Sequence, residues 1–595
     1  MKDTITMRET FLLECRSLLD VAAAAATVED ARGRLTGHVL NLRIANSMTR
    51  GERWTYRVNR VRDCARVLLI LLSARADSRT GFSVTHALWD LARGENRDDL
   101  GAGFFAEMIH LIRGLEGRTT ETSVGDSRAG FDDLDGREAA IARSDDLDSM
   151  WQRVEGMMSR YEHGLTDASI ERRARRRREI MQRLGASDAD WADWRWQVAQ
   201  VASDRAGVAR LVNLDAEEAA NIDRARQYRI PFGVTPFYTG LMDEQGGDRD
   251  RAIRAQVFPP ARYVDVIGPI RETRDEELDF MQERNTSPVD LVTRRYPNIA
   301  ILKPYNTCPQ ICVYCQRNWE IDEVLAPGAM ADWSKIEQAV SWIGEHPAIH
   351  EVLITGGDPL LIEDGDLTRL LDMVCALSSI SRVRIGTRTP VTMPMRFTEA
   401  LADLLGGYRV PGRREVALVT HVQHPYEVNP ELVAAVERLR LRGIPVYNQL
   451  VYTFFVSRRF ETALLRRLLR QAGIEPYYTF LPKGKEETDD FRVPLSRLLQ
   501  EQAEEARLLP GLTRADEAVY NVPRLGKNNL RAGQHRDLLT IMPDGTRIYE
   551  FHPWEKNIVP QKSYVGAVVP ILDYLERLAA TGEDPAEYES IWYYF

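Results

Sequence analysis

Six short apolar runs in the second half of the chain alternate with stretches long enough to form a helix. Each run has the length and the β-branched content of a buried strand, and helical sequence separates it from the next run. Parallel strands need crossover connections of this length, which are usually helices. The pattern therefore predicts an α/β fold with a parallel sheet, whose strands cover residues 299–302, 352–355, 383–386, 416–422, 446–451 and 477–481.

The first third of the chain has a different pattern, in which apolar residues recur at helical spacing. At 595 residues the chain is too long for one ordinary hydrophobic core. We expect a helical accessory domain of unknown role, a helical lead-in, the strand and helix series, and a closing segment, at residues 1–185, 186–290, 291–485 and 486–595. Within the closing segment, turn residues predict a hairpin of residues 538–541 and 547–551, followed by a helix over 564–578.

The charge balance argues against nucleic acid and anionic membranes as general partners. The chain has 78 basic and 88 acidic residues and a formal charge of −10. An arginine-rich run at 171–178 lies in helical sequence beside acidic residues, so we interpret it as a solvated helix face. We find no stretch with the length of a signal peptide or a membrane span. The six cysteines do not resemble a disulfide framework, which indicates a reducing, cytoplasmic location.

Three of the cysteines, Cys308, Cys312 and Cys315, follow the first predicted strand with CxxxCxxC spacing. Three thiolates on such a loop suit a [4Fe-4S] cluster in which the protein leaves the fourth iron open. That iron can bind the amino and carboxylate groups of S-adenosylmethionine (SAM) and pass one electron into it, which releases a 5'-deoxyadenosyl radical. A zinc site is the alternative, but zinc normally takes a fourth ligand, and no other Cys or His lies close in the sequence.

The cysteine spacing resembles that of the radical SAM superfamily, and other segments resemble the lysine 2,3-aminomutase (KamA-like) family. The resemblance begins near Trp191, includes residues 234–238, and runs to about Asn557. It implies a partial (βα)6 barrel with functional groups at the C-terminal ends of the strands. It also implies an isomerase that moves an α-amino group to the β-carbon of an amino acid.

The resemblance assigns SAM binding to residues that follow later predicted strands. Gly356, Gly357 and Asp358 resemble the segment that holds the methionyl part of SAM, where glycines allow close approach and N–H groups can receive a ligand. An ordinary turn is the alternative. His421 and Gln449 resemble family positions near the nucleoside, and buried, hydrogen-bonded side chains are the alternative for both.

Lys527 resembles the lysine that forms the Schiff base with pyridoxal phosphate (PLP) in this family, although the segment lacks the family's run of glycines. A solvated surface lysine is the alternative. The resemblance also implies that Arg295 and Tyr296 bind the phosphate, with Arg388 as a weaker candidate. PLP suits this chemistry because converting the amine into an imine supplies the π orbital that lets nitrogen migrate between carbons.

Arg317 matches the family arginine that binds the substrate α-carboxylate. Lys483 and Asn521 stand where lysine-specific members have aspartates, which resembles the glutamate 2,3-aminomutase pattern. Two like charges about 4 Å apart cost on the order of 4 kcal/mol at an effective dielectric near 20, which disfavours a lysine substrate beside Lys483. The alternative is that Lys483 points to solvent or that Lys485 takes its place.

The sequence thus predicts a radical SAM, PLP-dependent 2,3-aminomutase for a glutamate-like amino acid, with lysine or arginine as the alternative substrate. The cluster implies a flavodoxin or ferredoxin as electron donor, and homo-oligomerisation is left open. From another class, a PLP-independent radical SAM enzyme acting on a macromolecule is an alternative, as is a non-catalytic interaction protein built on the N-terminal helices. Lysine aminomutases carry zinc-binding cysteines in their C-terminal tail, but no cysteine follows Cys375, so we expect no zinc there.

Overall fold

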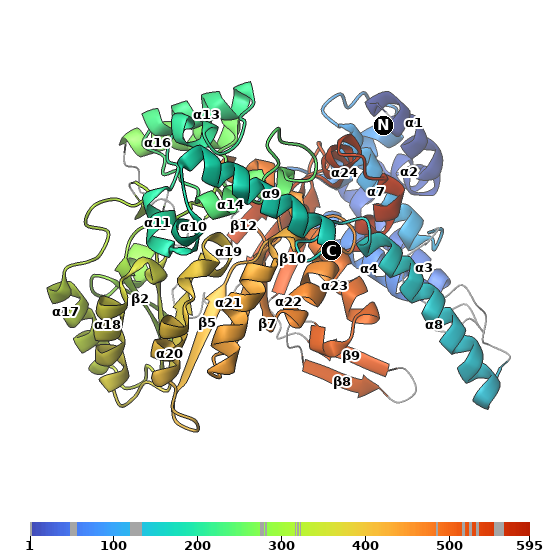
Figure 1. Ribbon diagram of the computed structural model, residues 1–595. Coiled ribbons are helices and arrows are strands. Elements are labelled where there is room, and N and C mark those ends of the chain that lie inside the picture. Colours follow the sequence, from blue (N-terminus) through green and yellow to red (C-terminus); the bar gives the residue numbers. More distant parts are fainter. Residues whose placement is uncertain are drawn as a thin grey trace. The chain divides into compact units, whose positions relative to one another are not determined.

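The chain divides into two compact units in the computed structural model (Figure 1). The terminal unit comprises Met1–Gly156, Arg492–Leu508 and Glu517–Phe595, and the sheet unit comprises Met157–Phe491 and Leu509–Asp516. The four-part domain organisation expected from the sequence stays a prediction. The structure describes residues 3–47, 56–119, 134–273, 279, 283–315, 317, 320–321, 323–482, 486–513, 518–522, 526–530, 535–552 and 564–595.

The sheet unit is built on a seven-stranded sheet with the strand order β1-β2-β3-β4-β5-β6-β7. Strands β2 to β7 pair in parallel and confirm the six predicted strands, whereas β1 pairs with β2 in antiparallel fashion and was not predicted. The strands are β1 (Val292–Tyr296), β2 (Ile299–Tyr305), β3 (Glu351–Gly356), β4 (Arg382–Gly386), β5 (Glu415–Thr420), β6 (Val446–Val451) and β7 (Ile474–Phe480).

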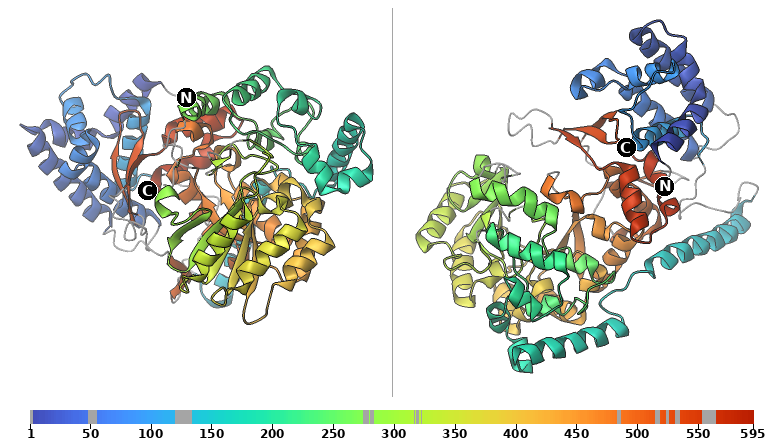
Figure 2. Two further views of the ribbon diagram at one scale, coloured as in Figure 1. Left: turned by 90° about the vertical axis from the view of Figure 1, so that its left-hand side faces the viewer. Right: turned by 90° about the horizontal axis from the view of Figure 1, so that it is seen from above.

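Helices connect the parallel strands and cover the sheet (Figure 2). Their buried faces follow helical spacing, as in α17, where Ile336, Ala339, Val340 and Ile343 face the core. The alternation of strand and helix is the physical reason that the parallel order could be predicted. The connecting helices are α17 (Trp333–Gly344), α18 (Asp364–Ala376), α19 (Thr389–Thr392), α20 (Glu399–Gly407), α21 (Pro430–Leu441) and α22 (Glu461–Gln471).

The lead-in of the sheet unit begins with α9, which contains the arginine-rich run. Arg173 pairs with Glu431 at 2.6 Å, and Arg176 donates to two backbone carbonyl groups at 3.1 and 2.7 Å. Both arginines are buried, so the interpretation of this run as a solvated face is wrong for them. The lead-in helices are α9 (Asp167–Leu184), α10 (Asp188–Ala192), α11 (Trp194–Ala199), α12 (Arg205–Ala209), α13 (Ala216–Gln227), α14 (Pro236–Thr239), α15 (Arg251–Arg254) and α16 (Ala261–Thr273).

The terminal unit combines helices from the start of the chain with strands and helices from its end. No helix in the described part of the chain combines the length and apolar character needed to cross a bilayer. The helices are α1 (Thr4–Glu14), α2 (Arg16–Ala23), α3 (Val28–Ser47), α4 (Tyr56–Leu71), α5 (Ala74–Thr80), α6 (Val84–Ala92), α7 (Ala102–Leu115), α8 (Gly136–Met158), α23 (Leu495–Leu508) and α24 (Ile571–Ala580).

The strands of the terminal unit form two small antiparallel sheets. The pairing of β10 with β11 confirms the predicted hairpin. The helix predicted over 564–578 is wrong in its first part, because residues 564–567 pair with β11 as a strand before α24 begins. The strands are β8 (Ala518–Val522), β9 (Gly526–Leu530), β10 (His535–Ile541), β11 (Arg547–His552) and β12 (Tyr564–Ala567).

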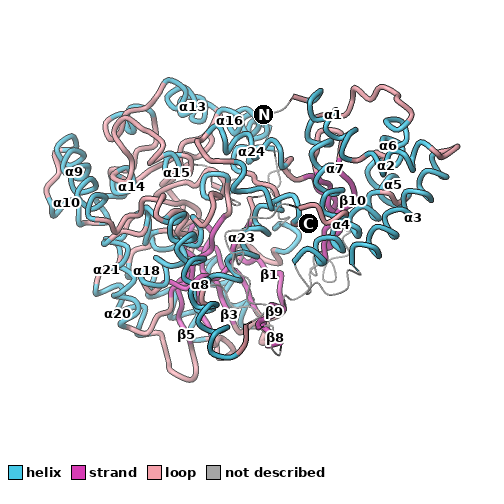
Figure 3. Tube along the Cα trace, turned by 90° about the vertical axis from the view of Figure 1, so that its right-hand side faces the viewer, coloured by secondary structure: helices cyan, strands magenta, loops and turns pink. Residues whose placement is uncertain are grey.

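Helix α7 joins the two ends of the chain within the terminal unit (Figure 3). A side chain at Gly103 would place its Cβ 2.1 Å from the carbonyl oxygen of Asp544, so this close packing requires glycine. Further along α7, Glu107 forms a buried, bidentate ion pair with Arg547, at 2.8 and 2.9 Å. The N-terminal helices therefore share one core with the C-terminal hairpin.

Candidate functional site

Cys308, Cys312 and Cys315 lie on the loop that follows the carboxyl end of β2, and each is partly buried. The loop is held by backbone hydrogen bonds from segments of the lead-in. The amide of Ile311 donates to Gly233 at 3.2 Å, and that of Val313 donates to Gln256 at 2.9 Å. These bonds fix the path of the loop between the cysteines, as expected for residues that must present thiols in one arrangement.

The thiols lie close enough to affect one another electrostatically. Burial raises the pKa of Cys308, and the charges of Asp358 and of the other two cysteines raise it further. Burial also raises the pKa of Cys312, although the neighbouring Arg388 opposes this. A positively charged centre bound by the sulfur atoms would favour their ionised form, and the inorganic core of a [4Fe-4S] cluster carries a positive charge. Within the described ranges, no three His, Cys, Asp or Glu side chains gather as ligands of a single metal ion.

Gly356 and Gly357 lie where β3 ends, and the second glycine contacts the segment that leads into the cysteine loop. A Cβ at Gly357 would lie 2.1 Å from the carbonyl oxygen of Thr307, so only glycine permits this approach. The amides of Gly357 and Asp358 donate to the carbonyl groups of Tyr305 and Thr307, both at 2.8 Å. Two N–H groups that we expected to face a ligand therefore bind the backbone, and the role of these residues in SAM binding stays a prediction.

The carboxylate of Asp358 links the loop after β3 to the loop after β4. It is buried and accepts hydrogen bonds from the Thr387 hydroxyl at 2.6 Å and from the amides of Arg388 and Thr389 at 2.9 and 3.1 Å. Burial raises the pKa of Asp358, and these hydrogen bonds oppose the increase. The side chain thereby fixes the backbone of Arg388 beside the cysteine loop.

The guanidinium of Arg388 connects the cysteine loop to a buried carboxylate. Its Nη1 lies 2.7 Å from Sγ of Cys312, and its Nη2 lies 2.9 Å from Oε1 of Glu427. Glu427 also accepts from the Tyr238 hydroxyl at 2.6 Å, and Gln256 hydrogen-bonds to both Arg388 and Glu427. Burial favours the protonated form of Glu427, but Arg388 and the hydrogen bonds outweigh it and hold the pKa below its ordinary value. A paired, ionised carboxylate thus lies close to a cysteine sulfur.

Glu427 and Gln256 were not predicted from the sequence, and Tyr238 was predicted only as part of a segment that resembles the family. Their partners lie 39 to 189 residues away, so no local spacing shows the network. Glu427 could have been found from its position, because it lies in the loop after a predicted strand, where parallel βα folds place functional groups. The predicted site residue Arg388 does reach the cysteines, but its side chain is already held by Glu427.

His421 and Gln449 come together at the ends of β5 and β6. Nδ1 of His421 lies 2.6 Å from the carbonyl oxygen of Gln449, and Nε2 lies 2.9 Å from the Tyr314 hydroxyl. Burial lowers the pKa of His421 to about 4, with a further contribution from Arg388. The neutral ring therefore donates from Nδ1 and accepts from the tyrosine hydroxyl at Nε2. The interpretation as a buried, hydrogen-bonded histidine describes this ring, and contact with SAM stays a prediction.

Arg317 lies next to the cysteine loop in a cluster of two cations and two carboxylates. Its Nη2 lies 2.9 Å from Glu283, which also pairs with Lys303 at 3.3 Å. Lys303 in turn lies 2.8 Å from Glu320, which is 4.0 Å from Arg317. The guanidinium predicted to bind a substrate carboxylate therefore holds a carboxylate of the protein. Glu283 and Lys303 were not predicted, because neither carries a motif.

Two of the remaining predicted residues lie at the edge of the sheet opposite the cysteine loop. Arg295 and Tyr296 lie on β1, and Tyr296 pairs with Ile299 at the amino end of β2, whereas the cysteines follow its carboxyl end. Lys527 and Asn521 belong to the terminal unit, where they are register partners, directly opposite each other in the hairpin of β8 and β9. Lys483 and its alternative, Lys485, lie outside the described residues.

The sequence matches the Radical SAM superfamily over residues 302–458, which include the end of β2, the cysteine loop and β3 to β6. An uncharacterized KamA family protein of Methanocaldococcus jannaschii is 42% identical over 549 residues, covering 89% of this chain and 88% of that protein. Glutamate 2,3-aminomutase of Clostridioides difficile is 27% identical, covering 65% and 86%. L-lysine 2,3-aminomutase of Fusobacterium nucleatum is 30% identical, covering 57% and 74%. Since the first match leaves only 11% of the chain uncovered, it extends into the N-terminal helices.

Proposed function

Because the chain belongs to the KamA family of radical SAM proteins, we propose that it is a PLP-dependent amino acid 2,3-aminomutase, an isomerase. The observation that carries the proposal is the similarity to relatives named glutamate and L-lysine 2,3-aminomutase over more than half of the chain. The reaction would move the α-amino group of an amino acid to its β-carbon. We extend the proposal to the fold, in which β2 to β7 would form the partial (βα)6 barrel.

Cys308, Cys312 and Cys315 would hold the [4Fe-4S] cluster, and family membership implies SAM as its partner. When bound, the cluster and SAM supply an adenosyl radical, and PLP supplies a π system for nitrogen migration. Arg388 would donate a hydrogen bond to the Cys312 ligand, and Glu427 would keep this guanidinium in place. His421, held neutral, would keep the carboxyl end of β5 joined to that of β6.

Arg317 would bind the α-carboxylate of the substrate in exchange for Glu283. The guanidinium already binds a carboxylate in this structure, which supports its use for one. Lys303 lies 3.3 Å from the second oxygen of Glu283, so this glutamate keeps a cationic partner when the substrate replaces it at Arg317. The exchange leaves the number of ion pairs unchanged, and it positions the substrate beside the cysteine loop.

PLP binding would depend on Lys527, with Asn521 opposite it in the same hairpin. Their register pairing supports a common location for the proposed Schiff-base lysine and the residue proposed to recognise the substrate side chain. We propose a glutamate-like substrate, on the pattern of Lys483 and Asn521, with lysine or arginine as the alternative. For the phosphate group, Arg295 and Tyr296 remain the proposed ligands by resemblance, whereas Arg388, the weaker candidate, already binds Cys312 and Glu427. A reduced flavodoxin or ferredoxin in the cytoplasm would supply the electron.

The test is anaerobic reconstitution of the full-length protein with iron, sulfide and PLP, followed by SAM, dithionite and a panel of glutamate, lysine and arginine. We expect a β-amino product from glutamate, detected by chromatography and mass spectrometry. Lys527→Ala should retain SAM cleavage and lose both bound PLP and product. Lys335→Ala, at an exposed lysine paired with Asp290, serves as the matched control and should keep all three. Turnover of lysine without glutamate would refute the substrate assignment.

A second function is favoured by the extent of the matches. The alignment with glutamate 2,3-aminomutase covers 86% of that enzyme but leaves 35% of this chain outside it. A radical SAM enzyme that acts on a macromolecule held by the terminal unit would cleave SAM but retain no PLP after reconstitution. The same preparation therefore separates the two functions through its PLP content.

A further inference from the structure

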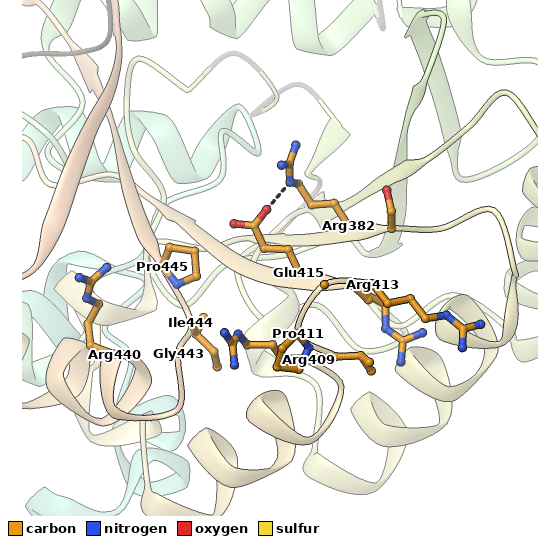
Figure 4. A pocket seen from close by; sticks show the side chains of 13 residues that line it. Arg382, Arg409, Pro411, Arg413, Glu415, Arg440, Gly443, Ile444 and Pro445 are labelled. Carbon is orange, nitrogen blue, oxygen red and sulfur yellow. Dashed lines mark hydrogen bonds and ion pairs between the residues drawn. The ribbon is translucent and has the colours of Figure 1, made fainter.

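A cavity of about 600 Å³ lies at the amino ends of β4, β5 and β6, within the sheet unit (Figure 4). The cysteines follow the carboxyl end of β2, so this cavity lies at the opposite edge of the parallel sheet. Five arginines and one glutamate line it, together with small and apolar residues of two loops. The charged residues are Arg382, Arg409, Arg413, Arg414, Arg440 and Glu415.

Within the described residues, three of the five arginines pair with no carboxylate, and one of these, Arg414, donates instead to the carbonyl groups of Tyr408 and Cys375, both at 2.9 Å. Arg382 pairs with Glu415 at 2.6 Å, and Arg440 lies 3.8 Å from Glu475. In the part of the chain that the structure describes, no carboxylate pairs with the guanidinium of Arg409 or that of Arg413. Arg382 also pairs with Glu351 at 2.9 Å, so five arginines face three glutamates and the excess is two positive charges.

The loop that carries these arginines is defined by its backbone. Val410 and Arg414 exchange two hydrogen bonds, at 2.9 and 2.7 Å, and Gly412 adopts a φ of +76° in the turn between them. The guanidinium of Arg409 lies against Gly443, where an added Cβ would come within 2.9 Å of Cζ. Glycine at both turns thus lets the arginines border the cavity without displacement of the strands.

We propose that this cavity binds a multiply charged phosphate compound, namely a di- or triphosphate chain. Its volume lies within the range of small-molecule sites, on the order of 300–1,000 Å³. The planar guanidinium group forms paired hydrogen bonds with phosphate oxygens, and several such groups around one cavity suit a ligand with several phosphates. The formal charge of −10 on the whole chain disfavours nucleic acid as the source of these phosphates.

Isothermal titration calorimetry of the full-length protein with inorganic tripolyphosphate tests the site without cluster, SAM or PLP. We expect one saturable binding event that weakens as salt is added. The double variant Arg409→Gln and Arg413→Gln should weaken binding at least about tenfold, because it removes two of the three guanidinium groups that pair with no carboxylate in the described part of the chain. Both side chains are exposed, so the variant should keep the wild-type melting temperature.

The matched control is Arg175→Gln with Arg178→Gln, which removes the same charge from two exposed arginines of α9. Binding should stay within about twofold of wild type in this variant, because long-range charge effects are screened. ATP and citrate identify the ligand class. Binding of ATP at least as tight as that of tripolyphosphate supports a nucleotide source, and tighter tripolyphosphate binding supports an inorganic one.

The proposal is overturned if tripolyphosphate shows no saturable binding, or if both double variants weaken it equally. Citrate binding as tight as tripolyphosphate would overturn the phosphate assignment. Since none of these residues touches the cysteine loop, aminomutase activity has no bearing on the result. Failure of this site and failure of the proposed reaction are therefore distinguishable.

Discussion

The two units each contain a buried arginine and glutamate pair, but the pairs have different surroundings. Arg388 and Glu427 of the sheet unit lie beside the thiol of Cys312. Glu107 and Arg547 of the terminal unit lie in a core, where the guanidinium also donates to backbone carbonyl groups near the chain end. In both units, removing the two charged side chains from water carries an unfavourable desolvation free energy. The pair in the sheet unit contacts the cysteine loop, whereas the pair in the terminal unit joins segments 440 residues apart.

Each unit also contains a buried histidine, and these two histidines likewise differ in their surroundings. His421 bridges Tyr314 and the carbonyl group of Gln449 in the sheet unit. His110 of the terminal unit stacks on Trp592 with a centroid distance of 4.5 Å and an interplanar angle of 5°. Burial lowers the pKa of both, to about 4 and about 3. The same chemical groups therefore indicate function only where they border other reactive groups, such as the cysteine thiols.

The largest expected effect concerns the structural pair. Glu107→Ala should lower the free energy of opening of α7 by about 3–5 kcal/mol, because Arg547 is left buried without its carboxylate. Native-state hydrogen exchange of α7 amides measures this loss. Glu95→Ala removes an exposed glutamate from a surface pair in the same unit, and it should cost less than about 1 kcal/mol.

A double variant shows whether the stability lost in Glu107→Ala comes from the unpaired charge of Arg547 or from lost side-chain packing. Combining Glu107→Leu with Arg547→Met should recover most of the lost stability, since apolar side chains of similar volume can replace a buried pair. If Glu107→Ala costs no more than the control variant, the pair does not join the chain ends and the contrast between the units fails.

The next effect is a pH dependence confined to the terminal unit. His110 stays neutral in the folded unit and has a pKa of about 3, whereas the unfolded chain binds a proton near pH 6.5. The stability that its burial maintains is present above pH 6.5 and is lost as the pH falls toward 3. Between pH 7 and pH 5 this amounts to about 2 kcal/mol. Hydrogen exchange of α7 measured across this range would show it.

His110→Phe keeps an aromatic ring against Trp592 and removes the titrating group, so it should flatten this dependence. His86→Phe, at an exposed histidine of α6, should leave the wild-type slope. An unchanged slope in His110→Phe would mean that the acid sensitivity arises from carboxylates rather than from this ring.

The pair in the sheet unit should affect chemistry more than folding. Glu427→Gln keeps the shape of the side chain but leaves Arg388 without a counter-charge beside Cys312, so we expect SAM cleavage under dithionite to fall at least about tenfold. Anaerobically reconstituted protein with measured iron content provides the assay. Glu431→Gln, which removes the partner of Arg173 at a partly exposed position, should cleave SAM at the wild-type rate. Equal rates in both variants would mean that the pair is merely structural.

The sheet could be predicted because its determinants are local. Each parallel strand is a short apolar run followed by a helix, and CxxxCxxC spacing lies within eight residues. Strand β1 was missed because only its first two residues, Val292 and Thr293, are buried, so its sequence shows neither an apolar run nor an alternating pattern. The strand at 564–567 was missed because its ladder is formed with β11, so pairing rather than helical propensity decides its structure.

The networks could not be predicted because their members are distant in sequence. Arg388 was identified, but no spacing rule connects it to Glu427, Tyr238 or Gln256. In the terminal unit nothing in the sequence of α7 shows that its partner, Arg547, lies near the other end of the chain. Burial of polar groups depends on tertiary pairing, and a single sequence does not contain that information in local form.

The smallest expected effect tests whether the sheet unit is prepared for a carboxylate. Glu283→Gln removes the charge that occupies Arg317, so the amino acid substrate should bind with a KM about threefold lower while kcat stays unchanged. Steady-state kinetics of the reconstituted enzyme with glutamate would measure this change. Glu345→Gln, at an exposed position after α17, should leave both constants unchanged. A higher KM in Glu283→Gln would show that Glu283 positions Arg317 instead of competing with the substrate, because loss of a positioning contact weakens binding whereas loss of a competitor strengthens it.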